Sequence, residues 1–287
     1  MGVTVKENLD YSINPGGTIL FAVSIIALVL SLSVFGLRMY VKLFMNRKVT
    51  PDDWWMMAAQ LIYIPYLIIC AYGPAVAGTG RWTAELTNDG IEMALWIWAI
   101  CEVIYPPMSF CVRMSIAWFL LRLAVVRWHK RVIKGVMWAN GIVSVFFMIP
   151  LVVQCVPLSY FWLRHKGAEG YCIDKAVVPV STIVHAVLGA ILDWTLAFLP
   201  IAMLWSVRIN RRTKAAIATV LGMGAFCGIS LIARIPFLKI IEISADFLHA
   251  TTGIATVAVL EPGVGIIAGS LVTLQPLLKR FKLGFAS

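Results

Sequence analysis

Seven apolar runs of membrane-spanning length constrain the fold of this chain more than any other feature. They cover residues 17–41, 53–78, 90–121, 133–157, 177–207, 214–239 and 248–278. A helix needs about 20 apolar residues to cross the hydrocarbon core of a bilayer. Within lipid, only helices and closed barrels satisfy all their backbone polar groups. The sequence therefore predicts an all-α membrane protein, a bundle of seven transmembrane helices.

Little of the 287-residue chain lies outside these runs. Residues 1–16 form a short polar segment before the first run, and residues 279–287 form a short tail. We therefore expect one seven-helix domain, residues 17–278, without a second folded domain. The first run is long enough to span and follows no cleavable signal, so we interpret it as an uncleaved anchor.

The lysines and arginines gather on one side of the predicted membrane. Sixteen of the 24 lie in the tail and in the connections after the first, third and fifth runs. Six lie on the opposite side, among several acids. The positive-inside rule then places the amino terminus outside or in a lumen and the carboxy terminus in the cytosol. Because the basic residues sit where they set orientation, the net charge of +10 does not indicate a nucleic-acid partner.

Five ionisable side chains interrupt the apolar runs: Glu102, Arg113, Asp193, Arg234 and Glu261. Such residues are costly in a membrane and by default mark a functional or pairing site. At about 1.5 Å of rise per residue, the three acids fall near mid-depth on three helices. We expect them to converge on one interior cavity, where a neutral carboxylic acid could donate a proton to a ligand. The alternative is that the acids pair with the arginines and fix the helix register.

Aromatic side chains accompany two of these acids. Trp98 and Tyr105 stand four residues before and three residues after Glu102, so the three share one helix face. Trp194 directly follows Asp193. An aromatic wall around an acid suits an apolar ligand and can stabilise a cation. The alternative is that these side chains pack between helices or face lipid.

The sequence offers no cofactor motif and no ladder of His and Glu residues at metal-site spacing. We therefore expect neither a cofactor nor a metal. A retinal Schiff base is not expected either, because the run at 248–278 has no lysine at mid-depth. Cys155 and Cys172 lie at the outer end of the fourth run and in the loop after it. In an oxidising lumen these two could form a disulfide bridge.

Short motifs follow one another in a particular order between Asp52 and Leu278. They are Asp52-Asp53-Trp54, Glu102-Val103-Ile104-Tyr105, Ser115, Arg122, Cys155-Val156-Pro157, Phe161-Trp162, Cys172-Ile173-Asp174, Asp193, Leu199-Pro200, Arg234, Glu261 and Thr273-Leu274-Gln275-Pro276-Leu277-Leu278. In this order and spacing the sequence resembles the fungal rhodopsin-domain family of integral membrane proteins. That family includes receptor-like proteins and membrane proteins encoded in mycotoxin clusters such as satratoxin. Arg113 departs from the family's usual lysine but keeps the charge.

The resemblance implies a seven-helix topology and leaves the activity open. Receptor-like members often carry a cysteine-rich extracellular domain or a long cytosolic tail, whereas only nine residues follow Leu278 here. We therefore favour the cluster-encoded type, a membrane-embedded enzyme of fungal secondary metabolism that takes a lipophilic, terpenoid or meroterpenoid-like substrate from the bilayer. Buried acids without a cofactor motif suit acid-initiated cyclisation or isomerisation. The rival is a seven-helix receptor for an external small molecule; a transporter is weakened by the lack of internal repeats.

Each candidate residue has an expected role in this hypothesis. One of Glu102, Asp193 and Glu261 is the general acid, and a second carboxylate holds or relays the proton. The substrate-binding candidates are Trp98, Tyr105, Trp194, Arg113 and Arg234. We expect a multi-pass protein of the endoplasmic reticulum rather than of the plasma membrane, with the lipid bilayer and a lipophilic small molecule as its partners.

Overall fold

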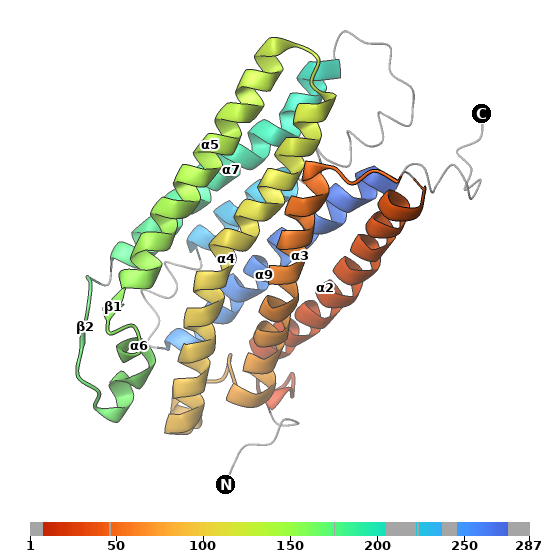
Figure 1. Ribbon diagram of the computed structural model, residues 1–287. Helices are drawn as coiled ribbons and strands as arrows, with labels where there is room; N and C mark the ends of the chain where they lie inside the picture. Colours follow the sequence, from red (N-terminus) through yellow and green to blue (C-terminus); the bar gives the residue numbers. More distant parts are fainter. Residues whose placement is uncertain are drawn as a thin grey trace.

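The computed structural model describes residues 8–45, 47–174, 176–204, 222, 224–236 and 246–274, and most of them lie in long helices (Figure 1). Six of these helices are long and apolar enough to cross a membrane: Pro15–Met45, Pro51–Ala77, Asn88–Leu123, Arg127–Val153, Val177–Met203 and Phe247–Leu274. A shorter apolar helix, Gly224–Pro236, lies within the predicted run at 214–239. The chain is therefore a multi-pass helical membrane protein. A seventh span and the side of each terminus stay predictions, and the tail at 279–287 lies outside the described residues.

The labelled helices follow the predicted runs closely. They are α2 (Pro15–Tyr40), α3 (Pro51–Tyr72), α4 (Asn88–Leu123), α5 (Arg127–Val153), α7 (Val177–Leu204) and α9 (Phe247–Leu271). Two π-helical segments, Val41–Met45 and Gly73–Ala77, continue α2 and α3. Three 3₁₀ turns cover Thr83–Glu85, Arg164–Lys166 and Val272–Leu274. A four-residue helix, α6 (Tyr160–Leu163), lies between two short strands.

Local capping explains why α2 and α3 each begin two residues before the predicted run. The side chain of Asn14 accepts a hydrogen bond from the Gly17 N–H at 2.9 Å, and Pro15 occupies the first turn. At α3, the Thr50 N–H donates to Asp53 Oδ2 at 2.9 Å, and Pro51 follows Thr50. Both arrangements satisfy N–H groups that a helix start leaves without partners. The helix of the first predicted run therefore begins at Pro15 rather than at residue 17.

Helix α5 begins at Arg127, six residues before the start of the predicted run at 133–157. The long basic side chains of this first stretch can reach the polar interface while their backbone stays helical. The helix ends at Val153 because the chain then enters strand β1 (Cys155–Val156), which pairs antiparallel with β2 (Tyr171–Cys172). We call residues 155–172 the disulfide hairpin. Residues 154–157 are therefore not transmembrane helix.

Helix α9 forms the centre of the bundle. It packs against α2, α3 and α4, while α4 also packs on α3 and α5, and α5 packs on α7. In the most apolar 18-residue stretch of the α9 span, 67% of the residues are buried inside the protein. In the corresponding stretch of the α2 span, 22% are buried. The disulfide hairpin lies at the same end of the bundle as the starts of α2 and α4 (Figure 1). Side chains from α9 therefore have neighbours on several helices.

A buried ion cluster joins the helices at the opposite end. Arg38, which is 1% exposed, contacts Asp53 at 2.7 Å and Asp52 at 2.8 Å. Its Nη1 donates to the Gly269 carbonyl of α9 at 2.6 Å. Lys42 Nζ lies 2.9 Å from Asp53 Oδ2. The cluster thereby ties α2 to α3 and α9, and explains why two adjacent acids stand at the start of a spanning helix.

We predict that Arg38→Met destabilises the protein by about 3–5 kcal/mol, because it removes the fully buried cation that both carboxylates contact and leaves mainly Lys42 to balance two buried negative charges. The measurement is the thermal midpoint of the purified protein in detergent, followed by size-exclusion chromatography. Lys48→Ala is the matched control, because Lys48 is an exposed cation of the same connection and surface substitutions usually change stability by within about 0.5 kcal/mol. Equal midpoints for the two variants would contradict the structural role of the cluster.

Candidate functional site

A cavity of about 790 Å³ opens between the helices at the hairpin end of the bundle. Its wall is mostly apolar and includes side chains from α2, α3, α4, α5, α7 and α9, together with the disulfide hairpin. The wall also carries polar and ionisable side chains, among them Glu102, Tyr105, Gln154 and Arg234 between the helices, and Arg164 and Asp174 near the hairpin end. Small-molecule sites are typically concave and mainly apolar, with a few placed polar groups. The cavity has this character.

Three of the predicted residues reach the cavity from one face of α4. Trp98, Glu102 and Tyr105 all line it, as their spacings of four and three predict. The Trp98 ring meets Phe247 of α9 edge to face, with centroids 5.5 Å apart. Pro106 and Pro107 have no N–H to donate to the carbonyls of Glu102 and Val103, so α4 lacks two helical hydrogen bonds at this point. The regular hydrogen-bond ladder of α4 is thus interrupted next to Glu102, which lines the cavity.

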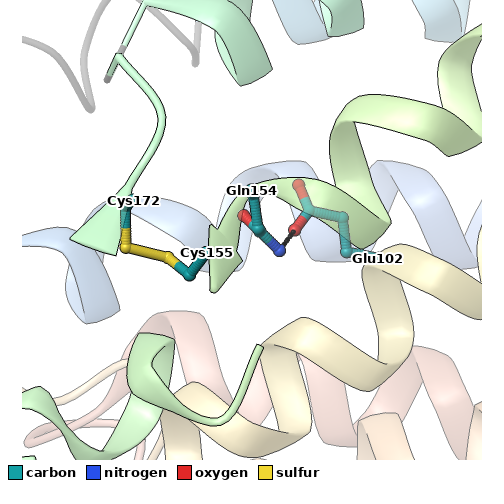
Figure 2. Close-up of a disulfide and its surroundings, with 4 residues drawn as sticks. All are labelled: Glu102, Gln154, Cys155 and Cys172. Atoms are coloured by element: carbon teal, nitrogen blue, oxygen red, sulfur yellow. Dashed lines mark hydrogen bonds between the residues drawn. A yellow bond between two sulfur atoms is a disulfide. The ribbon is translucent and has the colours of Figure 1, made fainter. Parts of the chain in front are cut away.

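Gln154 is the hydrogen-bond partner of Glu102 (Figure 2). Its Nε2 donates to Glu102 Oε2 at 3.4 Å, and its side chain is buried. Within the described part of the chain, no lysine or arginine lies at ion-pair distance from Glu102. Glu102 is thus a carboxyl group in a largely apolar wall with an uncharged amide beside it. Sequence reasoning missed Gln154; the available signal was an amide in the last turns of an apolar run, next to Cys155.

The disulfide hairpin fixes the position of this amide. Cys155 and Cys172, the two cysteines expected to pair, are joined by a disulfide and face each other across β1 and β2 (Figure 2). The Ile173 N–H also donates to the Gln154 carbonyl at 3.0 Å. Both cysteines line the cavity. The covalent bond and the short ladder therefore hold Gln154 at the junction of α5 and the hairpin.

A second group of ionisable side chains forms a buried ion-pair layer next to the cavity. Arg113 of α4 donates from Nε to Asp193 Oδ1 at 2.8 Å and from Nη2 to Asp193 Oδ2 at 3.1 Å. Its Nη2 also lies 3.2 Å from Glu261 Oε1. Gly189 of α7 leaves room for the guanidinium, because a Cβ there would lie 3.1 Å from Nη2. The two-pronged contact on Asp193 is the strong geometry for an arginine and a carboxylate.

Glu261 of α9 links this layer to the cavity wall. Arg234 Nη2 contacts Glu261 Oε2 at 2.7 Å, and the Tyr105 hydroxyl donates to the same oxygen at 2.7 Å. The Arg234 guanidinium also lies over the Tyr105 ring, 4.4 Å from its centroid. Ser109 accepts from Arg113 Nη1 at 2.7 Å. Two arginines and two acids therefore balance their charges in one connected network, which we call the ion-pair layer.

The expectation that three acids share one cavity is not met by the geometry. Asp193 and Glu261 come together through Arg113 and line a smaller cavity of about 50 Å³, whereas Glu102 lines the larger one. The reason is that both arginines lie among the acids and neutralise two of them. The pairing alternative thus describes Asp193 and Glu261, and the ligand alternative suits Glu102. A catalytic role for any of the three stays a prediction.

Trp194 is placed differently from the prediction. It packs on Gly228 of the Gly224–Pro236 helix, where an added Cβ would clash with the indole Nε1. It is absent from the residues that line the larger cavity. Successive residues of an α-helix point about 100° apart, so Trp194 faces a neighbouring helix while Asp193 faces Arg113. Within the described residues, no group of three or more His, Cys, Asp and Glu side chains gathers that could hold a metal ion.

Comparison with known proteins gives a consistent result. The pattern of the fungal rhodopsin domain matches residues 37–280. The polyenoic acids biosynthesis gene cluster protein Ba17b of Metarhizium anisopliae is 23% identical over 264 residues, which is 88% of this chain and 71% of that protein. The satratoxin biosynthesis SC1 cluster protein 4 of Stachybotrys chartarum is 29% identical over 119 residues, 40% of this chain and 41% of that protein. No solved structure matches the chain.

We predict a definite order of stability for variants of the ion-pair layer. Arg113→Met leaves Asp193 without its partner and should cost about 3–5 kcal/mol. Tyr105→Phe removes one hydrogen bond to a carboxylate and should cost about 1.5–3 kcal/mol. Thermal midpoints in detergent measure both. A Tyr105→Phe variant at least as unstable as Arg113→Met would show that Arg113 is not the central cation of the layer.

Proposed function

Because the chain belongs to the fungal rhodopsin domain family, we propose that it is a membrane-embedded enzyme of fungal secondary metabolism acting on a lipophilic substrate. Both similar proteins carry the names of biosynthetic gene clusters, for polyenoic acids and for satratoxin. The observation that carries the proposal is the 790 Å³ cavity in which Glu102 is the carboxyl group that a spanning helix contributes, set in an apolar and aromatic wall. We place the enzyme in the endoplasmic reticulum membrane, where its substrate enters from the bilayer.

The proposed chemistry is a cofactor-free, acid-initiated cyclisation or isomerisation of a terpenoid or meroterpenoid-like substrate. Glu102, as the neutral acid, transfers its proton to an alkene carbon or an epoxide oxygen. The Gln154 amide donates to the Glu102 carboxylate that remains. A C–C or C–O bond closes onto the cationic centre, and loss of a proton back to Glu102 ends the reaction. The sequence is redox-neutral and regenerates the acid.

Aromatic side chains suit the cationic stage of such a reaction. Trp98 and Tyr105 flank Glu102 in the cavity wall, and a cation over an aromatic face is stabilised by about 0.5–2 kcal/mol or more when desolvated. The apolar wall keeps water from capturing the cation. Arg234 borders the same cavity and is available to hold an oxygen of the substrate.

The other two acids have a supporting role in this proposal. Asp193 and Glu261 already accept hydrogen bonds from Arg113 and Arg234, so a proton transfer from either would disrupt the buried layer. Their carboxylates hold the two arginines in place, and Glu261 orients Tyr105 toward the cavity wall through the hydroxyl contact. Substitution of Glu102 should therefore lower catalysis without disturbing the buried ion pairs that stabilise the fold.

We predict that Glu102→Gln lowers product formation by about 10²–10⁴-fold, the usual contribution of a general acid. The assay compares lipophilic extracts of a fungus with the gene deleted, restored as wild type, or restored as the variant. The deletion and the Glu102→Gln strain should accumulate the same precursor, with the variant protein present at wild-type level. Glu85→Gln is the matched control, because Glu85 lies outside the residues that line the cavity. Wild-type amounts of product from the Glu102→Gln strain would contradict the role of Glu102 as the general acid.

A receptor is the second candidate, and one observation favours it. Hydrogen bonds run without a break from Tyr105 and Arg234 in the cavity wall, through Glu261 and Arg113, to Asp193 beside the smaller cavity. A ligand in the larger cavity could shift this chain of contacts toward the opposite end of the bundle. The extract comparison separates the two candidates: a receptor leaves its ligand unchanged, so deletion of the gene would cause no precursor to accumulate.

A further inference from the structure

Four of the six cysteines in the chain line the large cavity. Cys155 and Cys172 are joined in the disulfide hairpin. Cys70 of α3 and Cys101 of α4 are free thiols whose Sγ atoms lie 3.6 Å apart. The sequence predicts the first pair, whereas the second pair comes together through the packing of α3 on α4.

The separation of the two thiols is close to that needed for a bond. A disulfide has an S–S length of about 2.05 Å, so the sulfur atoms must approach by roughly 1.5 Å. Cysteine has a single side-chain torsion before its sulfur, and a modest rotation at either residue can supply such a movement. The two helices already pack against each other, so no rearrangement of the bundle is required.

The surroundings decide which oxidants can reach the pair. Cys70 is only 4% exposed, and both thiols belong to a wall that is mostly apolar. Water-borne disulfides such as oxidised glutathione are poorly suited to this wall. A small membrane-permeant molecule can enter the 790 Å³ cavity and contact both sulfurs. The cavity, rather than the aqueous surface, is thus the route of access.

We propose that Cys70 and Cys101 form an oxidisable dithiol site that closes to an interhelical disulfide when a lipophilic two-electron acceptor of the quinone or diazene class enters the cavity. The two thiols together lose two protons and two electrons as the S–S bond forms. The acceptor takes up both and becomes a hydroquinone or a hydrazine. The new bond ties α3 to α4 one residue from Glu102, so the oxidation state of the pair sets how freely this part of the wall moves.

The test counts free thiols in the full-length protein. Native membranes are treated with diamide, a permeant diazene, then denatured and alkylated with a maleimide polymer without reductant. The wild-type chain has four free cysteines, and diamide should reduce the alkylated number to two. Peptide mapping should find Cys70 joined to Cys101, with the loss of two hydrogens. Oxidised glutathione at the same concentration should act more slowly.

Two variants distinguish this pair from general thiol oxidation. In Cys70→Ser three thiols remain, and diamide should leave all three alkylated. Cys111→Ser is the matched control: it removes a free thiol outside the pair, so diamide should still lower the count by two. Four alkylated thiols in treated wild type, or a loss of two in Cys70→Ser, would overturn the proposal. Oxidation by glutathione as fast as by diamide would overturn access through the cavity. Because no outcome involves turnover, the test is independent of the proposed enzyme activity.

Discussion

The ion pair between Arg113 and its two carboxylate partners is the interaction on which the interior depends. It joins α4, α7 and α9 at a depth where water cannot replace a lost partner. Breaking such a pair leaves an uncompensated charge, which costs more than the intact pair contributes. Arg113 also fixes the positions of Tyr105 and Arg234, because both of these side chains donate hydrogen bonds to Glu261. The shape of the larger cavity is thus set in part by charges that do not lie in its centre.

The two buried charge groups divide the bundle by height. The cluster around Arg38 fastens α2 to α3 and α9 at one end. The ion-pair layer fastens α4, α7 and α9 further along. Between the layer and the disulfide hairpin lies the larger cavity, whose wall is mostly apolar and aromatic. This division leaves room for a lipophile without removing the contacts that keep the helices in register.

Much of this arrangement is readable from the sequence, and the remainder has a physical reason for being hidden. Apolar run length locates the six observed spans because lipid imposes that length directly. Helical spacing correctly places Trp98, Glu102 and Tyr105 on one face. Depth alone, however, does not give rotation about a helix axis, so the prediction that Asp193 and Trp194 share one pocket fails: Asp193 faces Arg113 and Trp194 faces Gly228. The partner of Glu102, Gln154, comes from the junction of α5 with the hairpin, which spacing within one helix does not predict.

The disulfide hairpin links the environment of Glu102 to the place where the chain is made. Gln154 immediately precedes Cys155, so the bond between Cys155 and Cys172 helps to fix the amide that faces the carboxyl group (Figure 2). Disulfides form in oxidising compartments and are rare in the cytosol. A chain that is inserted into a membrane without forming this disulfide would keep its helices, because the helices depend on lipid and on buried ion pairs. It would lose the fixed placement of one amide, so the choice of production host bears on the site more than on the fold.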